Sequence, residues 1–290
     1  MVTLVDLPPG LVTAFAVALG LVLGSFLNVV VYRLPKMMER QWAAECAEIS
    51  GQPVKHEAPF NLLVPRSRCP HCGHVIRWYE NIPVLSWLAL RGRCSACQAP
   101  ISLRYPLVEL VTAGFFALCA ARWGVSLQAA AWAGFAALLI CLFLIDMDTQ
   151  LLPDDLNYTL LWLGLIASAL GWTVPLPAAI WGAVFGYVAF WAIFQAFKLA
   201  TGKEGMGYGD FKLLAALGAW LGADYLLAIV LLSSIVGAVI GVLLILVGKL
   251  ANRNIPMPFG PYLAGAGLLC LLLDPSAVPG LLPFAFPFGR

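Results

Sequence analysis

Long apolar runs separated by short polar connections dominate the chain. Eight of these runs predict helices, at 11–31, 107–121, 125–145, 156–172, 175–197, 211–223, 225–248 and 259–273. A helix needs ~20 residues to cross the ~30 Å hydrocarbon core of a bilayer, and no charge interrupts the first run. The second and sixth runs are short. The pattern predicts an all-α polytopic membrane protein with about eight transmembrane helices.

One polar stretch, residues 32–106, breaks this pattern and contains all three histidines. We therefore expect three parts: a first transmembrane helix at 1–31, a small insertion at 32–106, and a transmembrane bundle at 107–290. Within the insertion, Met38, Trp42, Cys46 and Ile49 recur at spacings of three and four. This spacing predicts a short amphipathic helix, either on the membrane surface or packed on the insertion itself.

Composition and charge add an orientation to this picture. The chain is 61% apolar and 11% charged, whereas soluble proteins carry about 25% charge. Ten of the 17 Lys and Arg residues lie between Arg33 and Arg104, and basic loops stay in the cytoplasm. The insertion is thus expected to be cytoplasmic and the N-terminus periplasmic. The net charge of +2 gives no indication of a nucleic-acid partner.

Two CxxC pairs in the insertion predict a metal site. Cys69 and Cys72 form the first pair, and Cys94 and Cys97 form the second. Four thiolates at such spacing can surround Zn²⁺ tetrahedrally, and cytoplasmic thiols stay reduced, which disfavours disulfides. A closed site of four cysteines is structural. His71 and His74 are alternative ligands, and a thioredoxin-like redox role is a less favoured interpretation.

Two clusters of aspartates at predicted cytoplasmic helix ends stand out among the acidic residues. The first contains Asp146 and Asp148, followed by Pro153-Asp154-Asp155, and the second is Gly207-Tyr208-Gly209-Asp210. Helix N-capping is the ordinary explanation for Asp154, Asp155 and Asp210. An ionisable residue at the edge of the hydrocarbon region is nevertheless costly, and therefore a candidate functional residue.

Asp146 and Asp210 are the pair that we expect to converge. Gly207 and Gly209 lack side chains, so a second chain segment can approach the backbone there. Two carboxyl groups at an apolar boundary share a proton, which provides the acid and the base that peptide hydrolysis requires. Because a helix N-terminus favours an anion, Asp210 is predicted to be the resting base and Asp146, at a helix C-terminus, the resting acid.

These motifs resemble those of the type IV prepilin peptidases, the bifunctional leader peptidase/N-methyltransferases of bacterial inner membranes. The resemblance covers nearly the whole chain. It includes Gly24-Ser25-Phe26-Leu27-Asn28, both CxxC pairs, Arg104-Tyr105-Pro106 with Glu109, Asp146-x5-Leu152-Pro153-Asp154, Gly205-Met206-Gly207-Tyr208-Gly209-Asp210, and Pro258-Phe259-Gly260-Pro261.

The resemblance implies that Asp146 and Asp210 are the catalytic pair of a Gly-x-Gly-Asp aspartic protease. Asp148 is the nearest rival to Asp146, and the five residues between Asp146 and Leu152-Pro153 favour Asp146. The implied substrates are prepilins and pseudopilins, cut after Gly on the cytoplasmic face and then N-methylated with S-adenosylmethionine. Glu80, Glu109 and Glu204 are candidates for contacts with the basic leader, although solvation or salt bridging is the favoured explanation for each.

The cofactor site for methyl transfer is not readable from the sequence. No GxGxxG turn in a βαβ context is present, so the insertion, including Gly92 beside Cys94, is the expected location. Two other functions are weighed against the protease: a proton-coupled transporter and a noncatalytic zinc-bearing scaffold. A transporter favours carboxylates at the bilayer midplane and inverted repeats, whereas the acids here lie at helix ends and no repeat is found.

Overall fold

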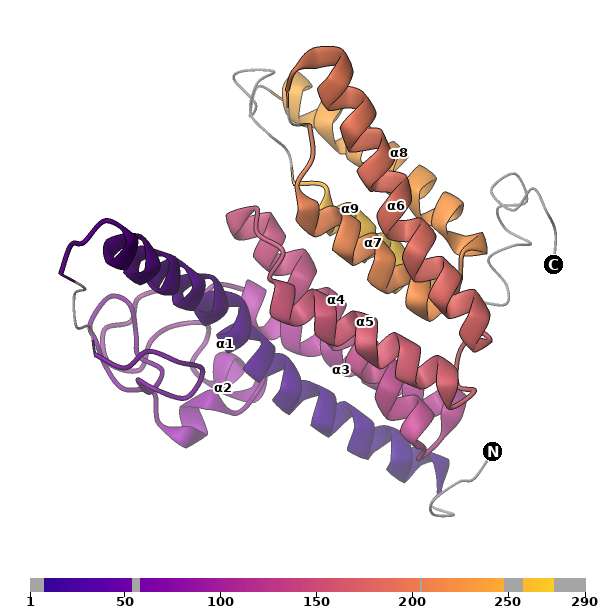
Figure 1. Cartoon of the computed structure of the whole chain (residues 1–290). Helices are drawn as coiled ribbons and strands as arrows, with labels where there is room; N and C mark the ends of the chain where they lie inside the picture. The colour runs from indigo at the N-terminus through magenta and orange to yellow at the C-terminus, as the bar shows by residue number, and fades with distance from the viewer. Residues whose placement is uncertain (1–7, 54–57, 204, 248–257, 274–290) are drawn as a thin grey trace. The chain divides into compact units, whose positions relative to one another are not determined.

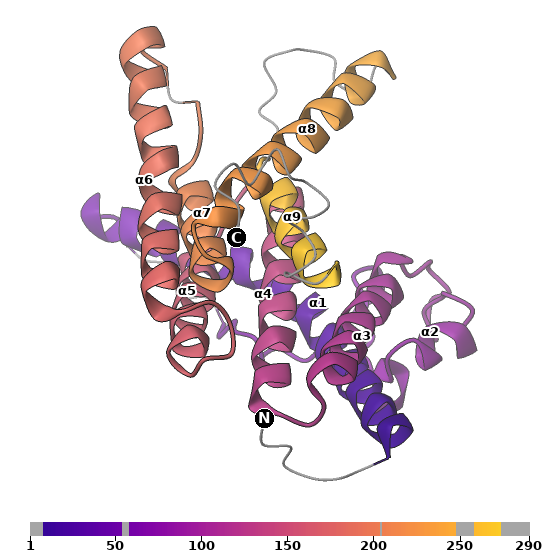
Figure 2. The ribbon, with the colours of Figure 1, turned by 90° about the vertical axis from the view of Figure 1, so that its right-hand side faces the viewer.

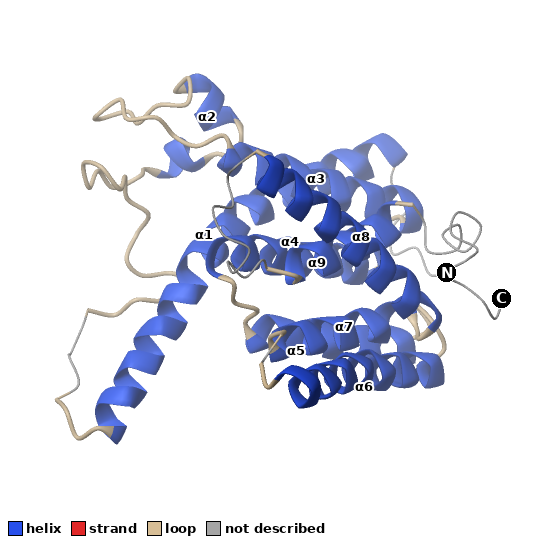
Figure 3. Cartoon of the chain, turned by 90° about the horizontal axis from the view of Figure 1, so that it is seen from above, coloured by secondary structure: helices blue, strands red, loops and turns tan. Residues whose placement is uncertain are grey.

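The computed structural model describes residues 8–53, 58–203, 205–247 and 258–273 (Figure 1). Its elements are α1 (Pro9–Ile49), the 3-10 turn η1 (Trp78–Asn81), α2 (Leu85–Ala89), α3 (Arg104–Trp123), α4 (Leu127–Thr149), α5 (Asp154–Ala169), α6 (Leu176–Thr201), α7 (Tyr208–Leu221), α8 (Asp224–Leu246) and α9 (Gly260–Leu272). In these ranges no strand is present (Figure 3). Eight of the helices coincide with the eight apolar runs, which confirms the all-α prediction.

The helices differ in whether they are long enough to cross a bilayer. Within the described ranges, five helices are long and apolar enough, namely α1, α3, α4, α6 and α8. The second predicted span is longer than expected, because α3 already begins at Arg104. By contrast, α5, α7 and α9 have 16, 14 and 13 residues and measure only about 20–24 Å. Five helices, rather than eight, meet the length of a full crossing.

The chain divides into two compact units, Met1–Ala133 and Gly134–Arg290. In the first unit, α1 and α3 pack closely through small residues (Figure 2). A Cβ added to Gly20 would lie 2.6 Å from the Cα of Ala113, and one added to Gly24 would lie 2.7 Å from the Cα of Glu109. Glycines four residues apart allow such close helix contacts in membranes. Asn28 also donates a hydrogen bond to the carbonyl of Tyr105 at 3.3 Å.

The predicted amphipathic helix at 38–49 is not a separate element. It is the end of α1, which has 41 residues and a length of about 60 Å, twice that of a bilayer core. Its apolar side chains Trp42 and Ile49 are exposed, so the described part of the insertion does not cover this face, although Arg40 contacts the ring of Phe60. Where the insertion begins, the guanidinium of buried Arg33 donates to the carbonyls of Asn61 and Pro65, at 2.8 and 2.6 Å, and so fixes the following loop to α1.

In the second unit, α7 forms the centre. Apart from Lys212, every residue from Asp210 to Leu221 is buried. The neighbouring α6 runs beside α7 (Figures 1 and 2), and a Cβ on Gly186 of α6 would lie 2.7 Å from the carbonyl oxygen of Leu214. On α5, the carbonyl of Leu160 accepts a hydrogen bond from the indole of Trp220 at 2.8 Å. The short α7 is therefore held by neighbouring helices rather than by lipid.

Candidate functional site

Asp146 and Asp210 come from different helices of the second unit, and both are buried. Asp146 lies in the last turn of α4 with 4% of its surface exposed, and Asp210 lies in the first turn of α7 with 8% exposed. Leu152 lies against Gly260, which contacts the Asp146 carboxyl, and against Gly209, which directly precedes Asp210. The structure thus brings the two predicted catalytic residues together.

Each aspartate also has one buried oxygen without a hydrogen-bond partner in the described part of the chain. These oxygens are Oδ2 of Asp146 and Oδ1 of Asp210. Most buried polar atoms in proteins are hydrogen-bonded, and the exceptions include reactive groups and places where a ligand or water completes the bonding. Asp148, by contrast, is exposed, because a step of two residues turns it to another side of α4.

Gly260, the first residue of α9, provides the space that the Asp146 carboxyl occupies. A Cβ added at Gly260 would lie 2.6 Å from Asp146 Oδ2 and 3.0 Å from the side chain of Leu152. Leu152 also contacts Gly209, where an added Cβ would meet the Cβ of Leu152 at 2.8 Å. Leu152 therefore lies against both glycines. The contact between Gly260 and Asp146 was not predicted, because it joins segments more than a hundred residues apart.

Gly207 differs from Gly209. The nearest atoms to a Cβ at Gly207 would be Asp210 Oδ2 and the backbone nitrogen of Gly209, both at 4.0 Å. There is consequently room beside the Asp210 carboxyl. Gly207 is also the N-cap residue of α7, and Pro153 is the N-cap residue of α5, with no side-chain cap at either helix. The capping explanation of Asp154, Asp155 and Asp210 is wrong, because all three lie inside their helices.

Polar and aromatic contacts fix the beginning of α7. The ammonium group of Lys212 donates to both carboxylate oxygens of Asp154, at 2.6 and 2.7 Å, which joins α7 to α5. Buried Asn157 donates to the carbonyl of Leu152 at 3.4 Å. The ring of Phe211, which follows Asp210, packs between Phe194 and Tyr208 with centroids 5.7 and 5.2 Å away. These contacts fix the first turn of α7, which carries Asp210.

The four cysteines of the insertion form a second candidate site. The sulfurs of Cys69, Cys72, Cys94 and Cys97 all lie within 4.8 Å of one another and could hold a metal ion. Ligands ~2.3 Å from a tetrahedral Zn²⁺ are separated by about 3.8 Å, and the sulfurs of Cys69 and Cys97 lie 3.8 Å apart. Backbone N–H groups of Cys72 and His71 lower the pKa of Cys69 to about 7, which favours its thiolate, whereas burial and the neighbouring cysteines raise the pKa of Cys97 to about 12. The donor set fits zinc.

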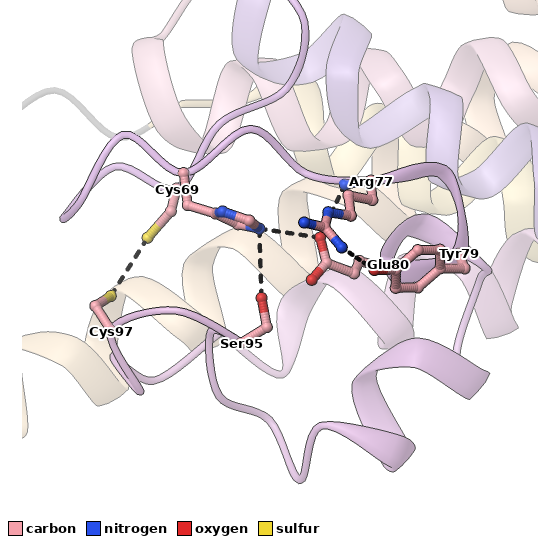
Figure 4. Close-up of polar contacts among 7 residues, drawn as sticks. Cys69, Arg77, Tyr79, Glu80, Ser95 and Cys97 are labelled. Atoms are coloured by element: carbon pink, nitrogen blue, oxygen red, sulfur yellow. Dashed lines mark hydrogen bonds and ion pairs between the residues drawn. The ribbon is translucent and has the colours of Figure 1, made fainter.

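A polar network joins the two cysteine pairs beside this cluster (Figure 4). The carboxylate of Glu80 accepts a hydrogen bond from the backbone N–H of Arg77 at 2.8 Å and contacts His74 Nε2 at 3.1 Å. That nitrogen also lies 3.4 Å from the hydroxyl of Ser95. The backbone of Arg77, then Ser95 and His74, lower the pKa of Glu80 to about 2. Because Ser95 and Glu80 approach the same imidazole nitrogen, the group lacks the relay geometry of a Ser-His-acid triad.

The three glutamates considered for binding a basic leader fall in different places. Glu80 belongs to the network just described. Glu109 is buried in α3, where its carboxylate accepts the backbone N–H of Val84 at 2.7 Å. Both are therefore engaged within the first unit: Glu80 pairs with His74, as salt bridging predicted, whereas Glu109 accepts a backbone N–H, which neither solvation nor salt bridging predicted. Glu204 lies outside the described residues.

Gly92, the candidate for methyl transfer, has a structural explanation. Its φ of +67° lies in the left-handed region, and a Cβ there would lie 2.8 Å from the ring of Trp87. The Trp87 indole in turn donates to the carbonyl of Ile101 at 3.2 Å. The close contact with Trp87 accounts for a glycine at this position without a cofactor.

Comparisons with known proteins identify the family of the chain. The family model for the bacterial peptidase A24 N-terminal domain matches residues 18–123, and that for the type IV leader peptidase family matches residues 133–242. Proteins named prepilin leader peptidase/N-methyltransferase from Stutzerimonas stutzeri and Pseudomonas aeruginosa are each 53% identical, with 93% of both chains covered. The protein of the same name from Aeromonas hydrophila is 53% identical, over 92% of this chain and 93% of its own.

No solved structure matches the chain. The relatives, the two family models and the five apolar helices nevertheless lead to one conclusion. The chain belongs to the type IV leader peptidase family and is a multi-pass protein of the bacterial inner membrane.

Proposed function

We propose that this protein is an intramembrane aspartic endopeptidase that removes the leader of type IV prepilins and pseudopilins after Gly, and then methylates the new N-terminal amine. The observation that carries the proposal is the burial of Asp146 and Asp210 beside each other, each with an oxygen that lacks a partner within the described residues. The names of the relatives support both activities. A transporter or a passive scaffold accounts for neither.

In the proposed reaction the two carboxyl groups share one proton. A water molecule attacks the carbonyl carbon of the scissile bond and gives a proton to Asp210, while Asp146 gives its proton to the carbonyl oxygen. The resulting diol collapses when Asp210 gives its proton to the leaving amine and Asp146 takes a proton back from a diol hydroxyl, so that the C–N bond breaks, a carboxyl group forms and both aspartates return to their starting states. This assignment rests on the helix ends, since Asp210 lies in the first turn of α7 and Asp146 in the last turn of α4.

Substitution of the aspartates tests the peptidase. Asp146→Asn and Asp210→Asn should each lower the cleavage rate of a prepilin with a Gly–Phe junction by at least about 10³-fold, in purified protein returned to lipid. Asp148→Asn is the matched control and should remain close to wild type, because Asp148 is exposed. If Asp148→Asn lost cleavage while Asp146→Asn retained it, Asp148 and not Asp146 would be the catalytic partner of Asp210. Retained cleavage in Asp210→Asn would contradict the proposed aspartic peptidase mechanism.

Zinc is proposed to stabilise the insertion. Cys69, Cys72, Cys94 and Cys97 would hold Zn²⁺ as four thiolates, and such a closed site supplies folding stability rather than a reactive water.

S-adenosylmethionine would supply the methyl group for N-methylation. No residue of this chain is assigned to it, since Gly92 is explained by Trp87. We place methyl transfer on the insertion. Gly92→Ala should therefore lower methylation and also loosen the fold of the insertion, and amide exchange of the insertion would show the second effect.

The orientation also belongs to the proposal. The N-terminus is placed in the periplasm, and the zinc insertion and both aspartates in the cytoplasm. The proposed parts are the first helix at 1–31, the insertion at 32–106 and the protease bundle at 107–290, although α3 packs with α1 in the first compact unit. Reporter fusions test the orientation: one joined after residue 53 should report the cytoplasm, and one joined after Trp123 the periplasm. The opposite pattern would invert the topology.

A further inference from the structure

Exposed apolar side chains lie on the part of the insertion that is fixed to a membrane helix. In the short helix α2, Leu85 is 65% exposed and Leu88 58%, and Trp78 in the preceding turn is 81% exposed. Leu85 and Leu88 are three residues apart, so they share one side of the helix. Removing such apolar side chains from water is favourable, and nothing among the described residues of the first unit covers them.

Two hydrogen bonds set the level of α2 relative to α3. The carboxylate of Glu109, five residues into α3, accepts the N–H of Val84 directly before α2. Trp87 of α2 donates to the carbonyl of Ile101, which lies just before α3 begins. Because α3 is long and apolar enough to cross a membrane, α2 is held where this helix enters the bilayer.

An exposed apolar side of α3 begins at the same level. Leu103, Leu107 and Leu110 are 66%, 58% and 55% exposed, and their spacing places them on one stripe of the helix. Leu103 lies two residues after Ile101, to which α2 is bonded. Leu85 and Leu88 are therefore close to the edge of the hydrocarbon region, where exposed apolar residues face the headgroups and not bulk water.

The charge of the same region is strongly positive. Residues 58–106 contain six arginines and one acidic residue, Glu80, and the Glu80 carboxylate already accepts Arg77 N–H and contacts His74. Arg66, Arg68, Arg77, Arg91 and Arg93 are exposed. Arginines beside exposed leucine and tryptophan side chains are typical of segments that bind the interface of anionic membranes.

We propose that Trp78, Leu85 and Leu88 form an interfacial ridge that inserts among lipid headgroups, while the neighbouring arginines bind anionic headgroups. The occupant is the bilayer that surrounds α1 and α3. This proposal concerns the first unit and does not depend on the peptidase activity. The ridge would fix the zinc insertion to the membrane surface, in addition to its two covalent connections.

Amide exchange of the full-length protein in nanodiscs tests the proposal. We expect residues 82–90 to exchange more slowly in discs that contain phosphatidylglycerol than in discs of phosphatidylcholine alone. Leu85→Gln/Leu88→Gln should speed this exchange in both lipids. Arg91→Gln and Arg93→Gln should speed it only in the anionic discs, by about fivefold for each arginine. Ile49→Gln, at an exposed apolar residue distant in sequence from α2, is the matched control and should change nothing.

Zinc content and the exchange of residues 69–74 verify that the variants remain folded. Equal exchange in both lipids, unaffected by any of the substitutions, would overturn the proposal. If protection of 82–90 arose only after a prepilin was added, the ridge would be a protein-binding surface and the lipid proposal would be wrong.

Discussion

At the scale of single residues, the contact between Gly260 and Asp146 places the tightest steric limit on the proposed catalytic pair. Gly260→Ala would place a Cβ 2.6 Å from Asp146 Oδ2, and the carboxyl must move. We expect cleavage to fall by about 100-fold or more, since small displacements of catalytic groups have effects of that size. Gly265→Ala is the matched control on the same helix, because its Cβ would meet only Phe143 at 3.8 Å. Equal activity of the two variants would contradict this role of Gly260.

The two glycines before Asp210 should respond differently to the same change. Gly209→Ala brings a Cβ to 2.8 Å from Leu152, and such overpacking costs typically 1–3 kcal/mol. Gly207→Ala meets nothing closer than 4.0 Å, so the fold should tolerate it. Thermal unfolding of both variants in the same detergent provides the measurement. A lower midpoint for Gly207→Ala than for Gly209→Ala would contradict the described packing.

At the scale of elements, the ion pair between Lys212 and Asp154 joins α7 to α5. The Asp154 side chain is 52% exposed, so solvent screening limits the contribution of this ion pair to the free energy of unfolding to about 1 kcal/mol or less. Lys212→Gln should therefore lower the unfolding midpoint slightly, and the loss should shrink at high salt. Asp154→Asn removes the other partner of the ion pair and should have the same effect. Asp155→Asn is its control, because it removes an equal charge one residue away. A loss that salt does not change would indicate packing and not charge.

How far the sequence predicts the structure differs between elements. Apolar runs with at most one charged residue each predict all eight longer helices, because a helix satisfies the backbone polar groups of such a run in a bilayer. Composition did not reveal that α1 continues as one helix to Ile49, since its polar end reads as a separate segment. The burial of α7 was also not predictable from its short run, because it depends on the neighbours that Gly186 and Trp220 contact.

The candidate sites also differ in how far the sequence predicts them. The spacing of the two CxxC pairs predicts a cysteine cluster because each pair is local, and the structure brings all four sulfurs within 4.8 Å. Glycines beside an aspartate indicate a close approach, but not which residue approaches. Leu152, Gly260 and Asp146 meet through tertiary packing, and His74 joins Glu80 to Ser95 across the insertion. Such contacts leave no periodic signal in a sequence.

At the scale of the whole molecule, metal removal should separate the insertion from the bundle. All four candidate ligands lie in the insertion, whereas both aspartates lie in the second unit. Chelation should therefore speed amide exchange in residues 69–99 and leave the exchange of α6 and α7 unchanged. Cys72→Ser should reproduce this effect, and Cys46→Ser, at an exposed cysteine outside the cluster, should not. Uniform loss of protection in both units would contradict a local stabilising role.

The central claim is that Asp146 and Asp210 act as one catalytic unit. Single-turnover cleavage of a prepilin by Asp146→Asn, Asp210→Asn and the double variant tests it most directly. Groups that act together have strongly non-additive effects, so the double variant should be no slower than the slower single variant. If the two losses multiplied instead, the aspartates would contribute independently and the shared-proton mechanism would be wrong.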